Sequence, residues 1–267
     1  MVSRDRGGRR HRVRILIRVA TPFVLVVLLW IGLIKVFALD PLVAKSPSDV
    51  WNYLFSGPDA GAHRDGIGTP LMQTLTDAGV GFAAGLGAAT AMALAFILVP
   101  GVQQTVLPVA VLVRSVPLVA MTPLITLVFG RDLLGTTVIC GIVVYFPALV
   151  IMAQGLRSAP RLTAELCRAY GAGPWAVARK VLIPSALPSL FASARVGVPS
   201  ALIGAMLAEW LATGKGLGYA MLLDPNSFDY TALWASVAVL TFTSIVLYTT
   251  VAGLEALVSA RFGAVQG

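Results

Sequence analysis

The sequence is poor in charge. Only 12% of its 267 residues are charged, whereas soluble domains carry roughly 25%. The deficit leaves three windows without Asp, Glu, Lys or Arg, at residues 78–113, 133–156 and 230–254. A helix needs roughly 20 apolar residues to cross a hydrocarbon core, so each window is long enough. A soluble domain is therefore excluded, and the lack of strict apolar–polar alternation excludes an outer-membrane barrel.

Side chains that hold metals or form catalytic dyads are also scarce. Cys140 and Cys167 lack metal-ligand spacing, and His11 and His63 are solitary. The segment TGKGLGY (213–219) is rich in glycine but lacks the G-x-x-x-x-G-K-[ST] order of a phosphate loop. These absences indicate a chain that is not an enzyme by itself and that holds no metal or cofactor of its own.

The charge that is present is mostly positive and unevenly placed. The net charge is +8, with seven arginines in the first 18 residues and five Lys or Arg from Arg157 to Lys180. Basic segments beside apolar runs indicate the cytoplasmic side of a membrane, whereas nucleic-acid binding calls for a basic face on a folded domain. We predict a basic cytoplasmic tail at residues 1–14 and no nucleic-acid partner. A cleaved signal peptide ending near Ala38 is the alternative; an uncleaved first helix fits the membrane-bound remainder better.

The apolar windows predict an all-α, polytopic membrane helix bundle within residues 15–267. We expect about six transmembrane helices, at about 15–37, 74–99, 104–129, 133–156, 186–211 and 232–257. This topology puts thirteen Lys and Arg on one side and four on the other, which predicts that both termini are cytoplasmic. Residues 40–70 and 212–231 would lie outside the cell, and the loop 157–185 inside.

The third predicted span contains three prolines, Pro108, Pro117 and Pro123. Each proline removes a backbone donor and tends to break a helix. In hydrocarbon the freed carbonyl groups need partners from protein or water, so broken helices belong in a bundle interior or beside a cavity. Pro117 and Pro123 are therefore candidates for a translocation pathway. Small residues in 79–95 would let a neighbouring helix approach closely.

Charges inside the predicted spans have more than one interpretation, because intramembrane charges often mark pathways but also pair with one another. Arg114 could face a path and attract an anion, or it could neutralise Glu209 or cap carbonyls beside Pro117; we favour the structural role. Arg195 is expected to snorkel or to pair. Glu209 could help gate an exit, while its neighbour Trp210 could equally mark the membrane interface.

The segment RSAPRLTAELCRAYGAGPWAVARKVLIPSALP (157–188) predicts two short helices. The first runs from about Pro160 to Tyr170 and ends at Gly171, where a left-handed residue costs little. The second runs from Trp175 to Leu182, with Pro174 before it and Pro184 as its expected end. Two short helices below a bundle are suited to docking a soluble partner.

The same segment resembles the cytoplasmic "EAA" loop of the permeases of ATP-binding-cassette (ABC) importers. The family pattern is Glu-Ala-Ala, three residues, Gly, nine residues, an aliphatic residue, one residue, an aliphatic residue and Pro. Glu165, Gly171, Val181, Ile183 and Pro184 match it without gaps. Leu and Cys stand where the family has the two alanines, at positions 166 and 167.

The resemblance extends over roughly residues 45–262. The segments SPSDVW (46–51), GFAAGLGAA (81–89), VRSVPLVAMTPLITLVFG (113–130) and AEWLATGKGLGYAM (208–221) are similar to the nitrate, taurine and aliphatic-sulfonate branch, which also includes permeases for pyrimidine-type vitamin precursors. The resemblance implies a type I importer fold and a small, in part anionic, class of substrates. It also implies a multi-pass protein of the bacterial inner membrane.

The partners follow from the same resemblance. It implies a second copy or a related permease, two cytoplasmic ATP-binding subunits that bind the ATP, and an extracytoplasmic substrate-binding protein. The residues expected to couple the permease to the ATPases are Glu165, Arg168, Ala169, Gly171 and Pro184. Glu165 and Arg168 would make polar contacts, and Gly171 would form the sharp turn.

Three other interpretations compete with the importer permease. A self-sufficient secondary carrier should show an internal repeat with paired broken helices and intramembrane acids; the sequence has no convincing repeat, and acids deep in the spans are scarce. A membrane-bound enzyme would need His, Asp or Glu clustered near one face, and the sequence lacks such a cluster. The basic loop could also be only an orientation signal, with Glu165 and Arg168 an ordinary i, i+3 ion pair. The flanking segments favour the importer permease.

Overall fold

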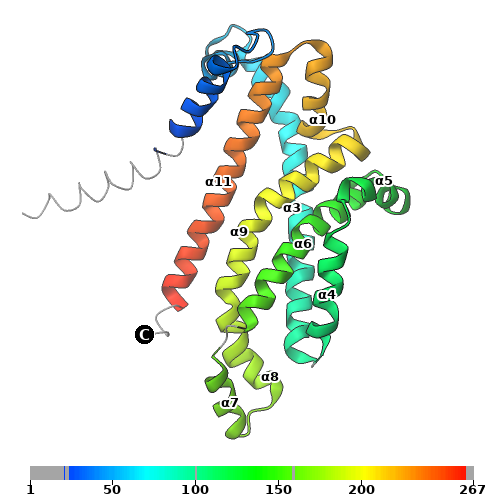
Figure 1. Ribbon diagram of the computed structural model, residues 1–267, viewed down its shortest axis with the longest axis vertical. Helices are drawn as coiled ribbons and strands as arrows, with labels where there is room; N and C mark the ends of the chain where they lie inside the picture. Colours follow the sequence, from blue (N-terminus) through cyan, green and yellow to red (C-terminus); the bar gives the residue numbers. More distant parts are fainter. Residues whose placement is uncertain (1–20, 22–23, 100, 158–159, 263–267) are drawn as a thin grey trace, which may run out of the picture. The chain divides into compact units, whose positions relative to one another are not determined.

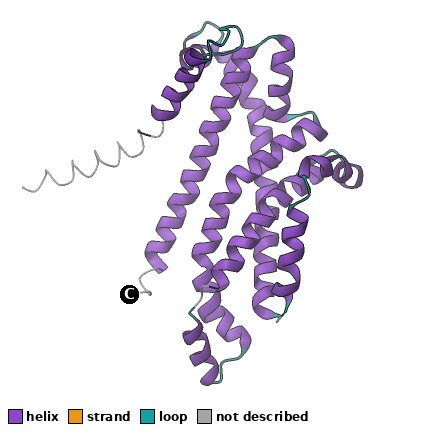
Figure 2. Cartoon of the chain, in the orientation of Figure 1, coloured by secondary structure: helices purple, strands orange, loops and turns teal. Residues whose placement is uncertain are grey.

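The computed structural model describes residues 21, 24–99, 101–157 and 160–262, and throughout these residues the chain forms helices and turns without a strand (Figure 2). An apolar helix at Val24–Val36 comes first. It is followed by α2 (Pro47–Trp51), η1 (Asn52–Ser56), α3 (Ala60–Leu98), α4 (Val102–Arg114), α5 (Leu118–Phe129), α6 (Leu133–Arg157), α7 (Arg161–Ala169), α8 (Pro174–Val177), η2 (Ala178–Leu182), α9 (Ile183–Ala208), η3 (Glu209–Thr213), α10 (Gly216–Leu223), η4 (Asp224–Ser227) and α11 (Tyr230–Phe262) (Figure 1). The predicted all-α fold is confirmed.

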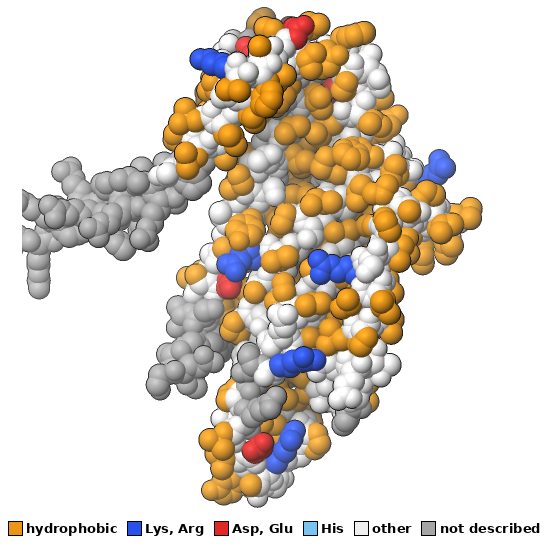
Figure 3. Space-filling view, in the orientation of Figure 1, with side chains coloured by type: hydrophobic (Ala, Val, Ile, Leu, Met, Phe, Trp, Pro, Cys, Tyr) orange, Lys and Arg blue, Asp and Glu red, His pale blue; other side chains and the backbone are white. Residues whose placement is uncertain are grey.

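Four helices of the described chain are long and apolar enough to cross a membrane. They are Ala60–Leu98, Leu133–Arg157, Pro174–Thr213 and Tyr230–Val258. Each contains one of the predicted spans, at 74–99 (to Leu98), 133–156, 186–211 and 232–257. Hydrophobic side chains cover most of the visible surface of these helices, and charged side chains are few (Figure 3). The predicted spans therefore identified these four helices correctly, three of them from uncharged windows and the fourth, at 186–211, from an apolar run that includes Arg195 and Glu209.

The segment 40–70, which we expect to lie outside the cell, is largely helical. It contains α2, η1 and the first turns of α3. The imidazole Nδ1 of His63 lies 3.0 Å from the carbonyl oxygen of Tyr53, and the Arg64 guanidinium donates to the carbonyl oxygen of Leu54 at 2.8 Å. The His63 ring also stacks on Tyr53 at 3.8 Å between centroids. These contacts hold a Gly-rich start of α3 in helical form, which local propensity alone disfavours.

The predicted third span, 104–129, is not one straight helix. It consists of α4 and α5, which are bent by 102° at Ser115–Pro117. Pro117 is the N-cap of α5 with an extended backbone (φ −60°, ψ 115°), whereas Pro108 and Pro123 lie inside helices without ending them. One of the three prolines therefore makes the break.

The predicted first span, 15–37, lies partly outside the described residues. Its described part is the helix Val24–Val36, which is shorter than a full span. The basic tail at residues 1–14 also lies outside the described residues. The structure thus describes four spans, or five if α4 and α5 together form one.

The chain divides into two compact units. Residues up to 65 together with 224–238 form one unit, and residues 66–223 together with the chain from 239 onward form the other. In the first unit, Trp30 stacks on Trp234 at 5.2 Å between ring centroids, and the Trp234 indole donates to the carbonyl oxygen of Val43 at 2.8 Å. In the second unit, α3, α6 and α9 surround the apolar core.

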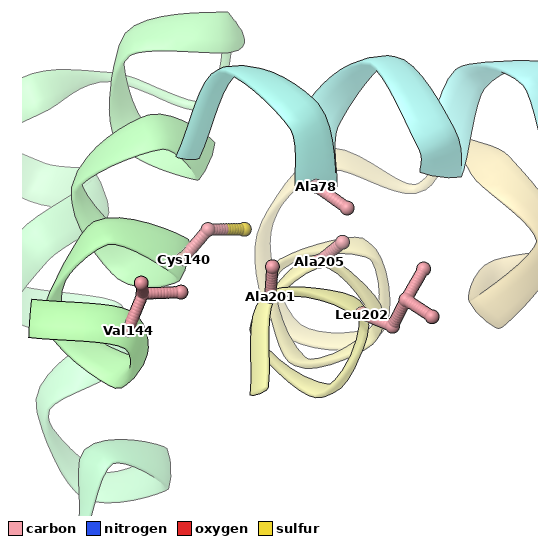
Figure 4. Close-up of a cluster of buried hydrophobic side chains, with 6 residues drawn as sticks. All are labelled: Ala78, Cys140, Val144, Ala201, Leu202 and Ala205. Carbon is pink, nitrogen blue, oxygen red and sulfur yellow. The ribbon is translucent and has the colours of Figure 1, made fainter. Parts of the chain in front are cut away.

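Small residues bring these three helices together. Figure 4 shows Ala78 of α3, Cys140 and Val144 of α6, and Ala201, Leu202 and Ala205 of α9 gathered in one cluster. A Cβ added to Gly81 of α3 would collide with the Cys140 side chain, and one added to Gly204 would lie 2.8 Å from the Cys140 Cα. The expectation that small residues in 79–95 permit close approach is therefore confirmed.

Candidate functional site

The helix α7 forms where the sequence predicts it. It begins after the N-cap Pro160 and ends at Tyr170, and Gly171 has a φ of +82°. The Gly171 amide donates to the carbonyl oxygen of Arg168, and the Ala172 amide donates to that of Cys167, both at 2.9 Å. This pair of bonds is a Schellman motif, in which the left-handed residue strongly favours glycine. Gly171 therefore makes the turn that reverses the chain after α7.

The second short helix continues into the membrane span, so the expected end at Pro184 is wrong. The helical segments α8, η2, α9 and η3 run without interruption from Pro174 to Thr213. Before Pro184 the backbone adopts a π register, and the Ile183 amide donates to the carbonyl oxygen of Ala178. Proline lacks an amide donor, and a local change of register accommodates it without ending the helix. Pro184 thus lies at the start of α9.

Helix α7 has one anchored face and one free face. Ala164 is buried and Cys167 half-buried, and both pack with Val177, Val181 and their neighbours in a small apolar cluster. The residues that share the opposite face are Leu162 (71% exposed), Glu165, Leu166 (51% exposed) and Ala169.

The tip formed by α7 and α8 presents apolar and charged groups side by side. Arg168 is exposed, Tyr170 is 90% exposed and Trp175 is 57% exposed. Figure 3 shows hydrophobic side chains there next to an acidic and a basic one. Within the described residues no ion pair joins Glu165 to Arg168, so both side chains are available to a partner. A short amphipathic helix of this kind can insert into a groove on another protein.

The pathway candidates lie elsewhere in the same unit. Arg114 is exposed at the end of α4, Pro117 begins α5, and Pro123 lies within α5. Glu209 begins η3, at the opposite end of the Pro174–Thr213 helix from α7 (Figure 1). The structure therefore separates the predicted coupling residues from Glu209 by the length of this helix.

The Glu209 carboxylate bonds to the glycine-rich turn rather than to Arg114. Its Oε2 atom accepts a hydrogen bond from the Gly218 amide at 2.7 Å, and Glu209 is fully buried. Across the described residues, no ion pair joins it to Arg114. The neighbouring Trp210 indole donates to the carbonyl oxygen of Gly218 at 2.6 Å. Sequence reasoning singled out Glu209 and Trp210 but not this partner.

Two further partners were missed. The Thr74 hydroxyl of α3 accepts a hydrogen bond from the Leu217 amide at 2.8 Å, and no sequence signal joins residues so far apart. Glu255 forms an ion pair with Arg195 at 3.1 Å, and the Arg195 guanidinium lies 5.9 Å from the centre of the Tyr248 ring. The expectation that Arg195 pairs is confirmed. The position of Glu255 at the end of an uncharged window could have identified it as the partner, because intramembrane charges tend to pair.

The helices described above identify the general class of protein to which the chain belongs. An all-helical chain with several membrane-length helices, a broken helix beside them and an exposed amphipathic helix between two spans is a multi-pass membrane protein. Residues 81–263 match the family described as binding-protein-dependent transport system inner membrane component. The match covers more than half of the chain, and the chain belongs to this family. The family is one of transport permeases rather than enzymes.

Curated relatives agree with this assignment. The chain is 30% identical over 147 residues to a probable ABC transporter permease protein of Haemophilus influenzae, a match that covers 55% of this chain and 60% of that one. It is 29% identical over 187 residues to the formylaminopyrimidine transport permease protein ThiX of Halalkalibacterium halodurans, covering 70% of this chain and 75% of that one. It is 32% identical over 155 residues to the riboflavin transport system permease protein RibX of Chloroflexus aurantiacus, covering 58% of each. The chain thus matches less than two thirds of the length of two of these three relatives.

A solved structure shares the fold. A chain of the MetNI methionine ABC transporter, in inward-facing conformations, superposes with a TM-score of 0.54 at 22% sequence identity. The superposition covers 71% of this chain and 92% of that one. This likeness supports the helical bundle and its connectivity.

Proposed function

We propose that this chain is the membrane-spanning permease subunit of an ABC importer. The observation that carries the proposal is the free face of α7, which holds Glu165 at the position of the glutamate in the "EAA" pattern and is followed by the left-handed Gly171. Its other face is anchored on α8 and η2. An anchored helix with an exposed apolar and charged face is suited to receive force from a soluble partner.

The soluble partner proposed for this face is a cytoplasmic ATP-binding subunit. Leu162, Leu166 and Ala169 would fill an apolar groove, while Glu165 and Arg168 would make polar contacts at its rim. Gly171 holds the turn, and Pro184 lies where the docking segment passes into the span. ATP would bind to the partner subunit, and two such subunits would act on a permease dimer formed with a second copy or a related chain.

The proposed direction is import across the bacterial inner membrane. The α7–α8 tip would face the cytoplasm, with both chain termini on the same side, as the distribution of Lys and Arg predicts. An extracytoplasmic binding protein would deliver substrate to the other side.

The substrate is proposed to be a small solute. The relatives named above carry formylaminopyrimidine and riboflavin in their descriptions, and relatives from Bacillus subtilis and Escherichia coli are described as putative aliphatic sulfonates transport permeases. The exposed guanidinium of Arg114, beside the break at Pro117, would suit an anionic group. Vitamin precursors, sulfonates and nitrate are the candidates to compare.

The test is reconstitution. The chain would be co-expressed with the ATPase encoded beside it, purified in nanodiscs and examined by native mass spectrometry. We expect two permeases with two ATPases, and loss of this complex when Glu165→Ala and Gly171→Pro are combined. Thr163→Ser, on α7 but off its free face, is the matched control and should leave the complex intact. Solute uptake by the chain alone in liposomes, without an ATPase, would instead identify a secondary carrier.

A further inference from the structure

A small cavity lies between three membrane helices at the end of the bundle that carries α7. It is lined by residues 90–97 of α3, 152–156 of α6 and 183–190 of α9, has a volume of about 60 Å³ and is partly open to the surface. One water molecule needs a cavity of 10–15 Å³, so this one has room for about four methylene groups. Along α3 and α9 the lining extends roughly 10 Å at the helical rise.

The wall of the cavity is apolar. Of the described residues that line it, Thr90 alone is polar, and its hydroxyl donates to the Leu86 carbonyl oxygen within α3 at 2.7 Å. Ala93 and Ala186 line the cavity where it is buried, and their small side chains leave the space empty. Water would find no partners there, whereas apolar cavities bind hydrocarbon. The large side chains of the wall are Leu94, Ile97, Leu156, Ile183, Leu187 and Leu190.

Close contacts between the three helices keep the cavity from closing. A Cβ added to Gly155 of α6 would collide with Ser189 of α9, and one added to Gly85 of α3 would lie 2.5 Å from the Gly141 carbonyl oxygen of α6. Protein interiors are packed densely and contain few voids larger than a water molecule. Because α6 already touches both of its neighbours, the helices cannot fill this void by moving together.

Basic side chains lie beside the cavity, toward α7. Arg157 directly follows Leu156, which lines the cavity. Arg179 and Lys180 lie about one helical turn before Ile183, which also lines it. All three basic side chains are exposed, and within the described residues no ion pair joins them to an acid. The segment 157–180 holds five Lys and Arg against one Glu, so its positive charge is largely uncompensated.

The cavity and the basic residues match the two parts of a phospholipid. The lining falls at the ends of the predicted spans 74–99 and 133–156 and around the start of 186–211, and the basic residues lie just beyond. An acyl chain in the cavity would therefore place its phosphate beside Arg157 and Arg179. Guanidinium groups bind phosphate through paired hydrogen bonds, and basic pockets between membrane helices bind anionic head groups.

We propose that this cavity is a binding site for an anionic phospholipid. One acyl chain lies between α3, α6 and α9, and Arg157, Arg179 and Lys180 hold the phosphate. The site involves neither nucleotide nor transported solute, so the inference does not depend on the proposed function. A zwitterionic phospholipid carries a cation next to its phosphate and binds less tightly to three basic side chains. Free phosphate lacks the acyl chain and does not compete.

Native mass spectrometry of the full chain in detergent tests the head-group contacts. The chain would be titrated with phosphatidylglycerol or with phosphatidylcholine of the same acyl chains, and we expect tighter binding of phosphatidylglycerol. Arg179→Gln and Lys180→Gln should each weaken that binding about fivefold and leave phosphatidylcholine unchanged. Arg131→Gln, at an exposed basic residue just before the other end of α6, is the matched control and should have no effect.

Three results of this titration would overturn the proposal. The first is equal binding of the two lipids to the wild type. The second is unchanged binding of phosphatidylglycerol when Arg157, Arg179 and Lys180 are all replaced by Gln. The third is displacement of phosphatidylglycerol by inorganic phosphate, since that would mean an anion site without an acyl chain.

Photocrosslinking locates the acyl chain. A phosphatidylglycerol with a photoreactive group in its acyl chain should label residues 90–97, 152–156 and 183–190 of the wild type. Ala186→Leu fills the cavity and should abolish this labelling, whereas Ala84→Leu adds the same side chain at an exposed position of α3 and should not. Equal labelling of α4 and α11 in the wild type would overturn the site. A dimer that excludes the lipid and dissociates in Ala186→Leu would overturn it too, because a second copy would then fill the cavity.

Discussion

The two ends of the Pro174–Thr213 helix are built differently. Beside its first turn, α7 exposes Leu162 and Leu166, whose burial would be worth roughly 25 cal/mol per Å². At its last turn, Glu209 and the bonds to α10 are enclosed within the chain. Apolar surface left free on a short helix calls for a partner, whereas a buried carboxylate must be satisfied internally. The first end therefore leaves surface free, whereas the second is closed by groups of the chain itself.

The largest expected effect is at the end of the helix beside α7, where an ATPase is proposed to dock; we call it the docking end. Gly171→Pro should abolish transport, because proline cannot adopt a φ of +82° and also removes the amide that donates to Arg168. Membrane insertion should persist, since the residue is exposed and outside the spans. Uptake in proteoliposomes and the amount of protein in the membrane would be measured together. Normal transport by this variant would refute the role of the turn.

A pair of glycines compares the two ends directly. Gly218→Ala would place a methyl group 2.7 Å from Glu209 Oε2 and 3.2 Å from the Met206 Cα, so we expect a loss of about 1–3 kcal/mol in the free energy of unfolding. Gly173→Ala has no atom within 4 Å of the added group and should be neutral. Denaturation in detergent would measure both variants. Equal losses would remove the distinction between a packed end and an open end.

Two tryptophans, one at each end of the Pro174–Thr213 helix, allow the stability of the two ends to be compared again. Trp210→Phe removes the hydrogen bond to the Gly218 carbonyl oxygen and should cost about 1 kcal/mol of stability. Trp175→Ala, at a side chain 57% exposed, should leave stability nearly unchanged but weaken ATPase binding. Thermal denaturation and a titration with the ATPase separate the two effects. A destabilised Trp175→Ala variant would show that the docking end is packed more tightly than its exposure suggests.

The middle of the helix should matter less than either end. The ion pair between Arg195 and Glu255 lies at side chains 35% and 20% exposed. Polar contacts between membrane helices are worth about 0.6 kcal/mol on average, so Glu255→Gln should lower stability only slightly. Uptake per ATP should stay at the wild-type value. A marked uncoupling by Glu255→Gln would mean that α11 takes part in transmission along the helix.

The smallest expected effect concerns the segment after α10. Burial, followed by the neighbouring Asp229, raises the pKa of Asp224 to about 6 from a usual 3.8. The fold therefore favours the protonated carboxyl, and this stabilisation is full below pH 3.8 and lost as the pH rises through 6. Amides 224–232 should exchange faster at pH 7 than at pH 4 after correction for intrinsic rates. Asp224→Asn should flatten that difference, and an unchanged profile would contradict the assignment.

The sequence predicted correctly those parts of the molecule in which backbone conformation is determined by residues nearby in the chain. Three uncharged windows and the apolar run at 186–211 identified four spans. Pro160, Pro174 and Gly171 marked the two short helices of the loop, because their effects on backbone conformation are local. The bend at Pro117 was not distinguished from Pro108 or Pro123. All three remove a donor, and only the surrounding packing decides which one breaks the helix.

The residues of the candidate site also fall into those that the sequence predicted and those that it missed. Glu165 was identified from the resemblance to the "EAA" loop, and Gly171 from the same resemblance and from its place after a short helix. The exposed face of α7 follows from the helical period. The link from Thr74 to Leu217 was not found, since the two residues are 143 positions apart. The continuation of the helix through Pro184 was also missed. A π turn before the proline accommodates the missing amide donor, so the helix does not end there.

The sequence by itself determined that this protein lies in a membrane, that it is helical and which family it resembles. Hydropathy, proline and glycine act over one or two turns of chain, so their effects can be predicted locally. Tertiary structure alone decided that α8 runs unbroken into a membrane span, that α4 and α5 meet at 102°, and that Glu209 accepts an amide of α10 rather than pairing with Arg114. These outcomes depend on which distant groups can satisfy a buried donor or charge. That depends on the packing of the whole bundle, not on any one segment.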